Sequence, residues 1–222
     1  MYNCDQCPKR SHRRCEHLEI RLIAMSSNSE LYTNRLILRQ WCEEDLAPFA
    51  QMNADPIVME YFPSVLSQKE SDELANKIQN HFQKNGFGFW AVEMPTVTRF
   101  AGFIGLSIPS FTAHFTPCVE IGWRLKKECW GQGYATEGAN ACLEFGFQEL
   151  QLKEIVSLTA TQNARSQRVM EKISMTRAPK DDFQHPLLPE THPLSHHVLY
   201  RINSTDSHCF WNGFGDRVAV LR

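Results

Sequence analysis

The sequence lacks the features that would place the chain in a membrane, on a polyanion or in the secretory pathway. It has no uninterrupted apolar run of about 18 residues, the length that a membrane-spanning helix needs. Its formal net charge is only −2, which argues against nucleic acid or an anionic membrane surface as a partner. The polar N-terminal stretch has no apolar h-region, so we expect no secretory signal and a cytoplasmic location.

Two familiar nucleotide-binding patterns are also missing. A dinucleotide fingerprint would need a third glycine three positions after Gly133, where this chain has Thr136. The G-K-[ST] ending of a P-loop occurs nowhere in the sequence. Any phosphate site must therefore be of a different kind.

Cysteine is present, but its placement argues against disulfides. The chain has eight cysteines. Four of them, Cys42, Cys118, Cys129 and Cys142, stand in apolar or motif segments, where a free thiol behaves as a small hydrophobic group. We therefore expect a reduced protein, which fits a cytoplasmic location.

Residues 1–29 differ in character from the rest of the chain. They contain a C-x2-C-x7-C-x-H array made of Cys4, Cys7, Cys15 and His17. Four such ligands can hold zinc, but the spacing is short for the common finger patterns and no helix or strand period surrounds it. The alternatives are a disordered basic tail, or a chain whose natural start is Met25. We expect an N-terminal extension over 1–29 and no metal in the domain that follows.

The rest of the chain is organised around residues 119–139. Val119, Ile121 and Leu125 alternate with polar or small residues, which is typical of a strand with one buried face. A glycine-rich turn follows at residues 131–133, and then apolar residues recur at the three- to four-residue spacing of a helix.

A strand that leads into a helix through such a turn can bind a diphosphate. Glycines allow positive φ and a close approach of the backbone. The first N–H groups of a helix have no partner within it and carry the positive end of its dipole. A G-x-G turn without any ligand remains the simpler alternative until the neighbouring residues are considered.

Those neighbours resemble a known family. The stretch W-G-Q-G-Y-A-T-E over residues 130–137, preceded by E-I-G-W-R-L, resembles the acyl-CoA loop of the GNAT acetyltransferases. The likeness is greatest to the branch that includes the ribosomal-protein N-terminal acetyltransferases. It extends over residues 31–203 and is specific again in the helix that begins at Asn163 and in the run 182–201.

The resemblance implies a fold and a domain plan. The fold is α/β (α+β), with a mixed, mostly antiparallel twisted sheet and helices on both faces. The GNAT domain should span 30–204, and 205–222 should be a C-terminal tail. Within the domain we expect one strand over 30–41, a helix over 67–84 with Ser67 and Glu70 as a capping box, a hairpin over 87–108, a strand over 154–161, and a last strand over 197–202.

The resemblance also implies acetyl-CoA as co-substrate and a set of residues that contact it. These cofactor-binding residues are Leu125, Trp130, Gly131, Gln132, Gly133, Tyr134, Ala135, Thr136, Asn163 and Ser166. Asn163 is also a good N-cap for its helix. Arg168 and Lys172 could reach a 3′-phosphate, although a solvated helix face explains them equally well. The histidines near residues 185–197 belong to the same likeness, which argues against a metal.

Acetyl transfer to an amine requires a neutral amine and a stabilised leaving thiolate. A lysine-like amine with a pKa of ~10.4 is almost wholly protonated at neutral pH, so a general base is useful. Glu120 is the candidate base, because it lies on the strand face opposite Val119 and Ile121. The alternative is that it only orients the acceptor or pairs with an arginine. Ser166 is the candidate donor to the thiolate.

Other assignments stay open from the sequence. Tyr61 and Phe62 belong to an acceptor loop by resemblance, but core packing is the simpler interpretation, as it is for Trp90. Glu128 stands where the family usually has Gln or Arg, which raises the alternative of a catalytically weak acyl-CoA-binding regulator. Ser174 replaces the usual glycine after the helix that begins at Asn163, so we expect a left-handed serine there. The acceptor is a protein N-terminus or a small-molecule amine, and the chain is a monomer or homodimer.

Overall fold

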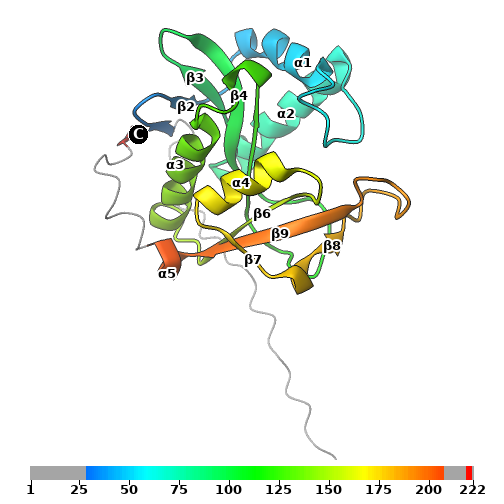
Figure 1. Ribbon diagram of the computed structural model, residues 1–222. Coiled ribbons are helices and arrows are strands. Elements are labelled where there is room, and N and C mark those ends of the chain that lie inside the picture. The colour runs from blue at the N-terminus through cyan, green and yellow to red at the C-terminus, as the bar shows by residue number, and fades with distance from the viewer. Residues whose placement is uncertain (1–28, 208–218, 222) are drawn as a thin grey trace, which may run out of the picture.

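The computed structural model describes residues 29–207 and 219–221, and within them the chain forms one twisted mixed sheet covered by helices on both faces (Figure 1). The strand order is β10-β1-β2-β3-β4-β5-β6-β9-β7, and β8 pairs with β9 off this path. The strands are β1 (Glu30–Tyr32), β2 (Ile37–Arg39), β3 (Phe89–Met94), β4 (Thr98–Ser107), β5 (Glu120–Leu125), β6 (Glu154–Ala160), β7 (Thr176–Arg177), β8 (Phe183–Gln184), β9 (His196–Asn203) and β10 (Ala219–Leu221).

Helices connect the strands at four main places. The α-helices are α1 (Leu46–Ala54), α2 (Gln68–Asn85), α3 (Tyr134–Gln148), α4 (Ala164–Lys172) and the short α5 (Ser204–Ser207), and the 3-10 turns are η1 (Glu43–Asp45), η2 (Lys127–Cys129) and η3 (Pro179–Asp181). Figure 1 shows α3 and α4 on the near face of the sheet, with α1 and α2 behind it. The expected fold class is therefore confirmed.

The sheet is antiparallel except where β5 meets β6. That parallel contact is limited to one residue pair, Glu120 with Val156. The N–H of Val156 donates to the carbonyl of Val119 at 3.0 Å, and the Ser157 hydroxyl donates to the carbonyl of Ile121 at 2.9 Å. Regular backbone pairing stops beyond this point, so the two strands separate directly after Glu120.

The core forms two layers because strand residues alternate between faces. Trp90, Ile104 and Ile121 pack with α3 on one face. Phe103 packs with Phe49 of α1 and Ile78 of α2 on the other. Trp90 is completely buried, and its indole N–H donates to the carbonyl of Ser29 at 2.9 Å. Its assignment to the core is confirmed.

The helix α2 is defined by local signals that the sequence carries. Ser67 is its N-cap, and its hydroxyl accepts from the N–H of Glu70 while the Glu70 carboxylate accepts from the N–H of Ser67. This is the expected capping box. The helix ends at Gly86, which has a φ of 75°. A left-handed residue after the last turn is the usual stop for a helix.

Two expectations about the ends of the domain were wrong. The predicted single strand over 30–41 is divided into β1 and β2, because a turn closes where the N–H of Thr33 donates to the carbonyl of Leu36 at 3.0 Å. The segment 205–222 was expected to be a tail, but Ala219–Leu221 forms β10 and pairs with β1. The backbone of β1 leaves one edge open, and β10 fills it. The N-terminal cysteine and histidine array lies outside the described residues.

Three features of the described residues bear on the sequence predictions. None of their helices combines the length and apolarity that a bilayer crossing demands. Cys42, Cys118, Cys129 and Cys142 are free thiols. In the same part of the chain, no group of three or more His, Cys, Asp or Glu side chains has the arrangement of a metal site.

Candidate active site

The loop between β5 and α3 presents backbone donors to the surface. Gly131 and Gly133 have φ values of 75° and 84°, which favour glycine. Gly133 is the N-cap of α3, and no side chain caps the helix. The first intrahelical bond is made by Glu137, whose N–H donates to the Gly133 carbonyl at 3.0 Å. The N–H groups between them are therefore left without a partner in the helix.

The space above these glycines is open. A Cβ placed on Gly131 would meet no atom within 4 Å, and one placed on Gly133 would meet only the Nη2 of Arg35, at 3.5 Å. An anionic ligand can therefore approach the backbone of Tyr134, Ala135 and Thr136 directly. The cradle fits a diphosphate by geometry and by the dipole of α3.

Side chains of the loop hold its shape. The indole N–H of Trp130 donates to the carbonyl of Leu125 at 2.8 Å, which fastens the loop to the buried end of β5. The amide of Gln132 donates to the carbonyl of Glu128 at 3.0 Å. Trp130 and Gln132 therefore use these polar groups to stabilise the loop, and the carboxylate of Glu128 makes no ion pair within the described residues.

Arg35 is a loop residue that the sequence did not identify. Its guanidinium pairs with Glu137 at 2.6 Å, donates to the carbonyl of Gln132 at 3.0 Å and lies 4.5 Å from the centre of the Tyr134 ring. Thr33 donates to the same Glu137 carboxylate at 2.7 Å. The turn between β1 and β2 thus supports the start of α3. The sequence signal for Arg35 was the T-N-R segment at 33–35, which resembles the family, but the resemblance assigned no role to this arginine.

The beginning of α4 brings Asn163 and Ser166 together as expected. The Oδ1 of Asn163 accepts from the N–H of Ser166 at 3.2 Å, so Asn163 is the predicted N-cap. Its Nδ2 donates to the hydroxyl oxygens of Thr159 at 2.9 Å and Ser166 at 3.1 Å. Because the Ser166 oxygen accepts a bond, its own proton is available to another acceptor. Ser174 follows α4 with a φ of 62°, so the left-handed serine is confirmed.

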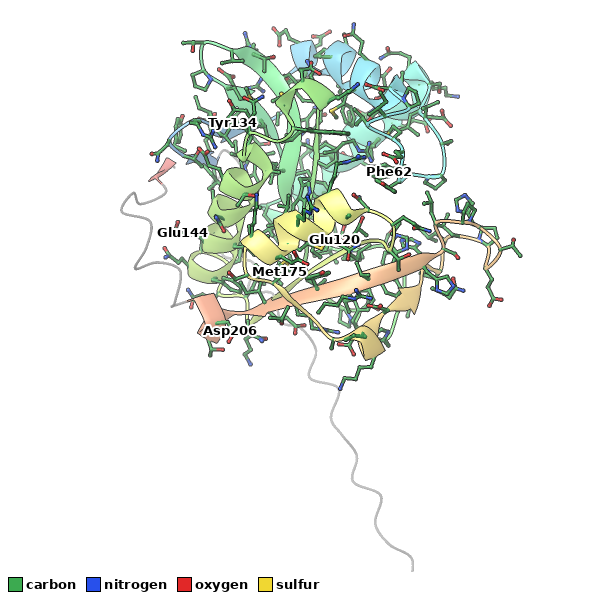
Figure 2. The ribbon with its side chains drawn as sticks, viewed as in Figure 1. Phe62, Glu120, Tyr134, Glu144, Met175 and Asp206 are labelled. Atoms are coloured by element: carbon green, nitrogen blue, oxygen red, sulfur yellow. The ribbon has the colours of Figure 1, made fainter. Side chains whose placement is uncertain are left out.

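Glu120 lies where β5 and β6 separate. Figure 2 shows it near the centre of the molecule. The Ser107 hydroxyl donates to its Oε1 at 3.0 Å. Burial raises the pKa of Glu120 to about 7, and the bond from Ser107 opposes this only partly. A carboxyl group with a pKa near neutrality can accept a proton and release it under physiological conditions.

A second group of residues surrounds Arg124, on the same strand face as Glu120. The guanidinium of Arg124 donates to the Oδ1 of Asn53 at 2.6 Å and lies over the ring of Phe62, 4.0 Å from its centre. The Phe62 side chain is 37% exposed, so core packing is the wrong interpretation of this residue. Figure 2 shows Phe62 on the loop that follows α1. The period-2 pattern of β5 puts Arg124 on the same strand face as Glu120, but it gives no partner for Arg124.

Arg165 links this loop to α4. Its guanidinium pairs with Glu60 at 2.5 Å and lies 4.7 Å from the centre of the Trp130 ring and 5.3 Å from that of Tyr61. Tyr61 is half-buried, and it faces this arginine. The loop after α1, the glycine loop and α4 therefore meet around Arg165.

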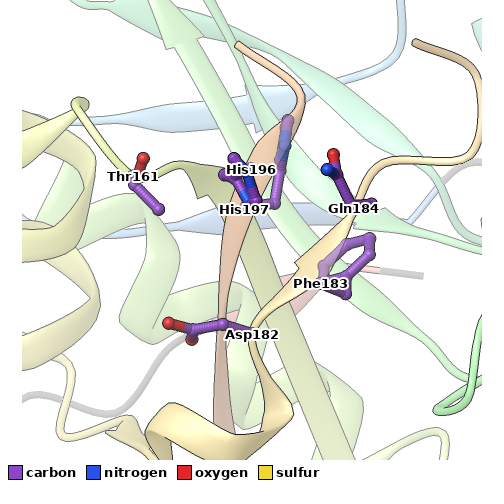
Figure 3. A pocket seen from close by; sticks show the side chains of 6 residues that line it. All are labelled: Thr161, Asp182, Phe183, Gln184, His196 and His197. Carbon is purple, nitrogen blue, oxygen red and sulfur yellow. The ribbon is translucent and has the colours of Figure 1, made fainter. Parts of the chain in front are cut away.

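A pocket of about 390 Å³ lies at the C-terminal end of β6 and the start of β9 (Figure 3). It is lined by Thr161, Asp182, Phe183, Gln184, His196 and His197. None of the predicted site residues lines it, although Thr161 stands only two positions before Asn163. Burial lowers the pKa of His197 to about 4, and its ring packs 4.8 Å from that of His185. His197 is thus a neutral packing residue.

Comparisons with known proteins agree with this geometry. The family model of the acetyltransferase (GNAT) domain matches residues 35–176. The uncharacterized protein YkkB of Bacillus subtilis is 34% identical over 152 residues, which are 68% of this chain and 87% of that protein.

Solved structures extend the likeness to the fold. A GNAT-family acetyltransferase from Bacillus anthracis is 25% identical with a TM-score of 0.64, over 79% of this chain and 99% of its own. The ribosomal-protein-S5-alanine acetyltransferase of Vibrio fischeri has a TM-score of 0.63 at 14% identity, over 80% of this chain and 97% of its own. At that identity the second likeness concerns the fold alone.

Proposed function

Because the chain belongs to the GNAT acetyltransferases and depends on acetyl-CoA as co-substrate, we propose that it acetylates a primary amine with Glu120 as the general base. The amine is a protein N-terminus or part of a small molecule. The sequence resemblance favours the branch that includes the ribosomal-protein N-terminal acetyltransferases. The domain that carries this activity is the segment 30–204.

The proposed cofactor contacts lie at the N-terminal ends of α3 and α4. The backbone of 131–136 holds the diphosphate, because its N–H groups are open and its glycines leave room. The end of β5 at Leu125 lies on the path between this loop and Glu120. Asn163 and Ser166 at the start of α4 hold the pantetheine and thiol end. Acetyl-CoA supplies the activated acetyl thioester.

The chain's own residues handle the protons. The Glu120 carboxylate takes the proton of the acceptor ammonium, directly or through a water, and so produces the nucleophilic amine. An α-amine with a pKa of ~7.7 needs little help, whereas a lysine-like amine needs much more. The Ser166 hydroxyl, held by Asn163, donates its proton in a hydrogen bond to the departing thiolate.

The observation that carries the proposal is a partly buried carboxyl group, with a pKa near neutrality, at the separation of β5 and β6. The test is calorimetric titration with acetyl-CoA followed by a thiol-release assay on a panel of amines. Binding at micromolar concentration with turnover of at least one amine supports the proposal. Absence of binding at tens of micromolar contradicts it.

The alternative of a weakly catalytic regulator has less support. It depends on Glu128, which is exposed on η2 and whose backbone carbonyl accepts from the Gln132 amide. A carboxylate on the surface can turn away from a diphosphate at low cost. This alternative predicts acetyl-CoA binding without thiol release on any amine, so the same assay separates the two functions.

A further inference from the structure

Arg124 is a partly buried cation whose hydrogen-bonding capacity is largely unused. Its Nη1 donates to the Oδ1 of Asn53, but its Nε is buried and has no acceptor in the described part of the chain. A guanidinium offers five N–H donors, and the Nε edge is the one that grips two oxygens of a carboxylate or phosphate at once. An unpaired buried cation is costly, so such an arrangement points to a missing anion.

The surroundings of Arg124 supply no negative charge. Its nearest neighbours are the rings of Phe62, at 4.0 Å, and Phe103, at 5.4 Å, together with the neutral amide of Asn53. Asn53 is fixed in turn, because its Nδ2 donates to the Ser71 hydroxyl at 2.7 Å. No carboxylate of residues 29–207 forms an ion pair with Arg124.

The charge of this arginine persists at neutral pH. Burial lowers the pKa of Arg124 to about 10, and no acidic group offsets that effect. The side chain is therefore still protonated in the cell. The aromatic rings on its faces leave the edge of the guanidinium as the direction for an incoming oxygen.

We propose that Arg124 binds an anionic group, a carboxylate or a phosphate, of the acetyl acceptor, so that the preferred acceptors carry a negative charge as well as an amine. The inference rests on the proposed function, because it places the acceptor on the face of β5 that carries Glu120. Polyamines then become poor acceptors, since their distal cations would meet Arg124.

The spacing along β5 sets the size of this acceptor. Glu120 and Arg124 stand four residues apart on the same strand face, which corresponds to about 13 Å between their Cα atoms. Between them is Gly122, and a Cβ there would come within 3.2 Å of the Phe89 ring. The middle of the acceptor therefore faces a half-buried aromatic ring. An extended peptide of about three residues covers roughly 10 Å and suits this span.

The competing explanation is that Arg124 only fixes the loop after α1 through Asn53 and Phe62. Both roles predict that its loss lowers activity, so total activity cannot decide between them. A purely structural role would reduce the turnover of all acceptors alike. Anion recognition would reduce only the turnover of the acceptors that carry the anion.

The experiment uses matched acceptors that differ in one charge. The tripeptide Ala-Phe-Ala is compared with its C-terminal amide, phosphoethanolamine with ethanolamine, and spermidine serves as the cationic acceptor. The proteins are the full-length chain and its Arg124→Gln and Arg124→Lys variants. Arg99→Gln is the control, because Arg99 is an exposed cation on β4 whose loss changes the net charge equally. The readouts are kcat/KM, acetyl-CoA affinity, and the affinity for N-acetylated Ala-Phe-Ala and its amide.

We expect kcat/KM to be at least tenfold higher for one acidic acceptor than for the neutral acceptor matched to it. The pair that shows this preference identifies the bound anion as a carboxylate or a phosphate. Arg124→Gln should reduce this preference below twofold while acetyl-CoA affinity changes less than twofold. Arg124→Lys should retain part of the preference, and Arg99→Gln all of it. Preference for the amide or for spermidine would overturn the inference. So would an equal loss of kcat/KM in Arg124→Gln for the acidic acceptor and for its neutral counterpart.

The failure of the proposed function has a different signature. If acetyl-CoA binds but no amine is turned over, the acetylated peptides still decide about Arg124. Tighter binding of the acid than of the amide, lost in Arg124→Gln, would support anion recognition without catalysis. Equal binding of both would reject it.

Discussion

The glycine loop over 131–136 comes from one continuous stretch of chain, whereas the surroundings of Arg124 are assembled from β5, α1 and the loop after α1. The first side of the site depends on backbone N–H groups and positive φ values at Gly131 and Gly133. The second depends on side chains, namely Asn53, Phe62 and Arg124 itself. The proposed cofactor side can therefore be recognised as a motif, and the proposed acceptor side cannot.

This difference has a consequence for how each side tolerates change. A backbone cradle accepts most side-chain changes but fails when a Cβ enters it. A side-chain cluster can change its specificity through single substitutions and leave the backbone intact. On this basis we expect the preference for one amine to be set on the proposed acceptor side and not on the proposed cofactor side.

The largest effect is expected from Gly133→Val. Valine at a φ of 84° is strained, and its branched side chain would occupy the approach to the N–H groups of α3. We expect acetyl-CoA affinity to fall at least about 100-fold by calorimetry. Gly86→Val is the matched control, because Gly86 has a φ of 75° and no atom near its Cβ position. Equal affinity losses in both variants would mean that strain, and not access, is responsible.

Glu120→Gln tests the proposed general base. The amide keeps the bond from the Ser107 hydroxyl but cannot accept a proton. General base catalysis contributes about 10²- to 10⁴-fold, so we expect kcat/KM for a lysine-like amine to fall at least 100-fold. Acetyl-CoA affinity should stay within twofold. A loss below tenfold would assign Glu120 to acceptor orientation instead.

The pH dependence of the reaction gives a separate test. Glu120 acts as a base only when deprotonated, and its pKa is raised to about 7, so kcat/KM should rise as the pH increases through 7. The acceptor amine contributes its own rise at higher pH. Comparing the wild-type profile with that of Glu120→Gln isolates the carboxyl group. An identical rise near pH 7 in both proteins would exclude it.

Ser166→Ala should have a smaller effect, confined to turnover. Alanine retains the backbone N–H that donates to the Oδ1 of Asn163, so α4 stays capped. What is lost is one hydrogen bond to the leaving thiolate, and we expect kcat to fall about tenfold. Acetyl-CoA affinity should remain within twofold by calorimetry. If affinity and kcat fell together, Ser166 would be a binding residue and not a catalytic one.

The smallest effect is expected at Ser174, which ends α4. Serine at a φ of 62° is strained, and glycine would relieve the strain while adding freedom to the unfolded chain. We expect Ser174→Gly to raise the free energy of unfolding by up to about 1 kcal/mol in urea denaturation, with kcat unchanged. Ser174→Ala is the control and should give no gain. A lower stability of the glycine variant would contradict this account.

Local rules made much of the fold predictable from the sequence. The capping box at Ser67 and Glu70, the N-cap at Asn163 and the left-handed Ser174 were all predicted, since each depends on a few neighbouring residues. The division of 30–41 into two strands was missed. It depends on a turn at Thr33 that also contacts Glu137 of α3, a residue more than 100 positions along the chain.

The sequence by itself determined the glycine loop, the alternation of β5 and the caps of α2 and α4, because backbone geometry and burial period are encoded locally. Only the tertiary structure decided the rest. It separated β5 from β6 at Glu120, raised the pKa of that carboxyl group by burial, and placed Phe62 on Arg124. Desolvation and side-chain contact depend on residues far apart in the chain, so no local pattern could specify them.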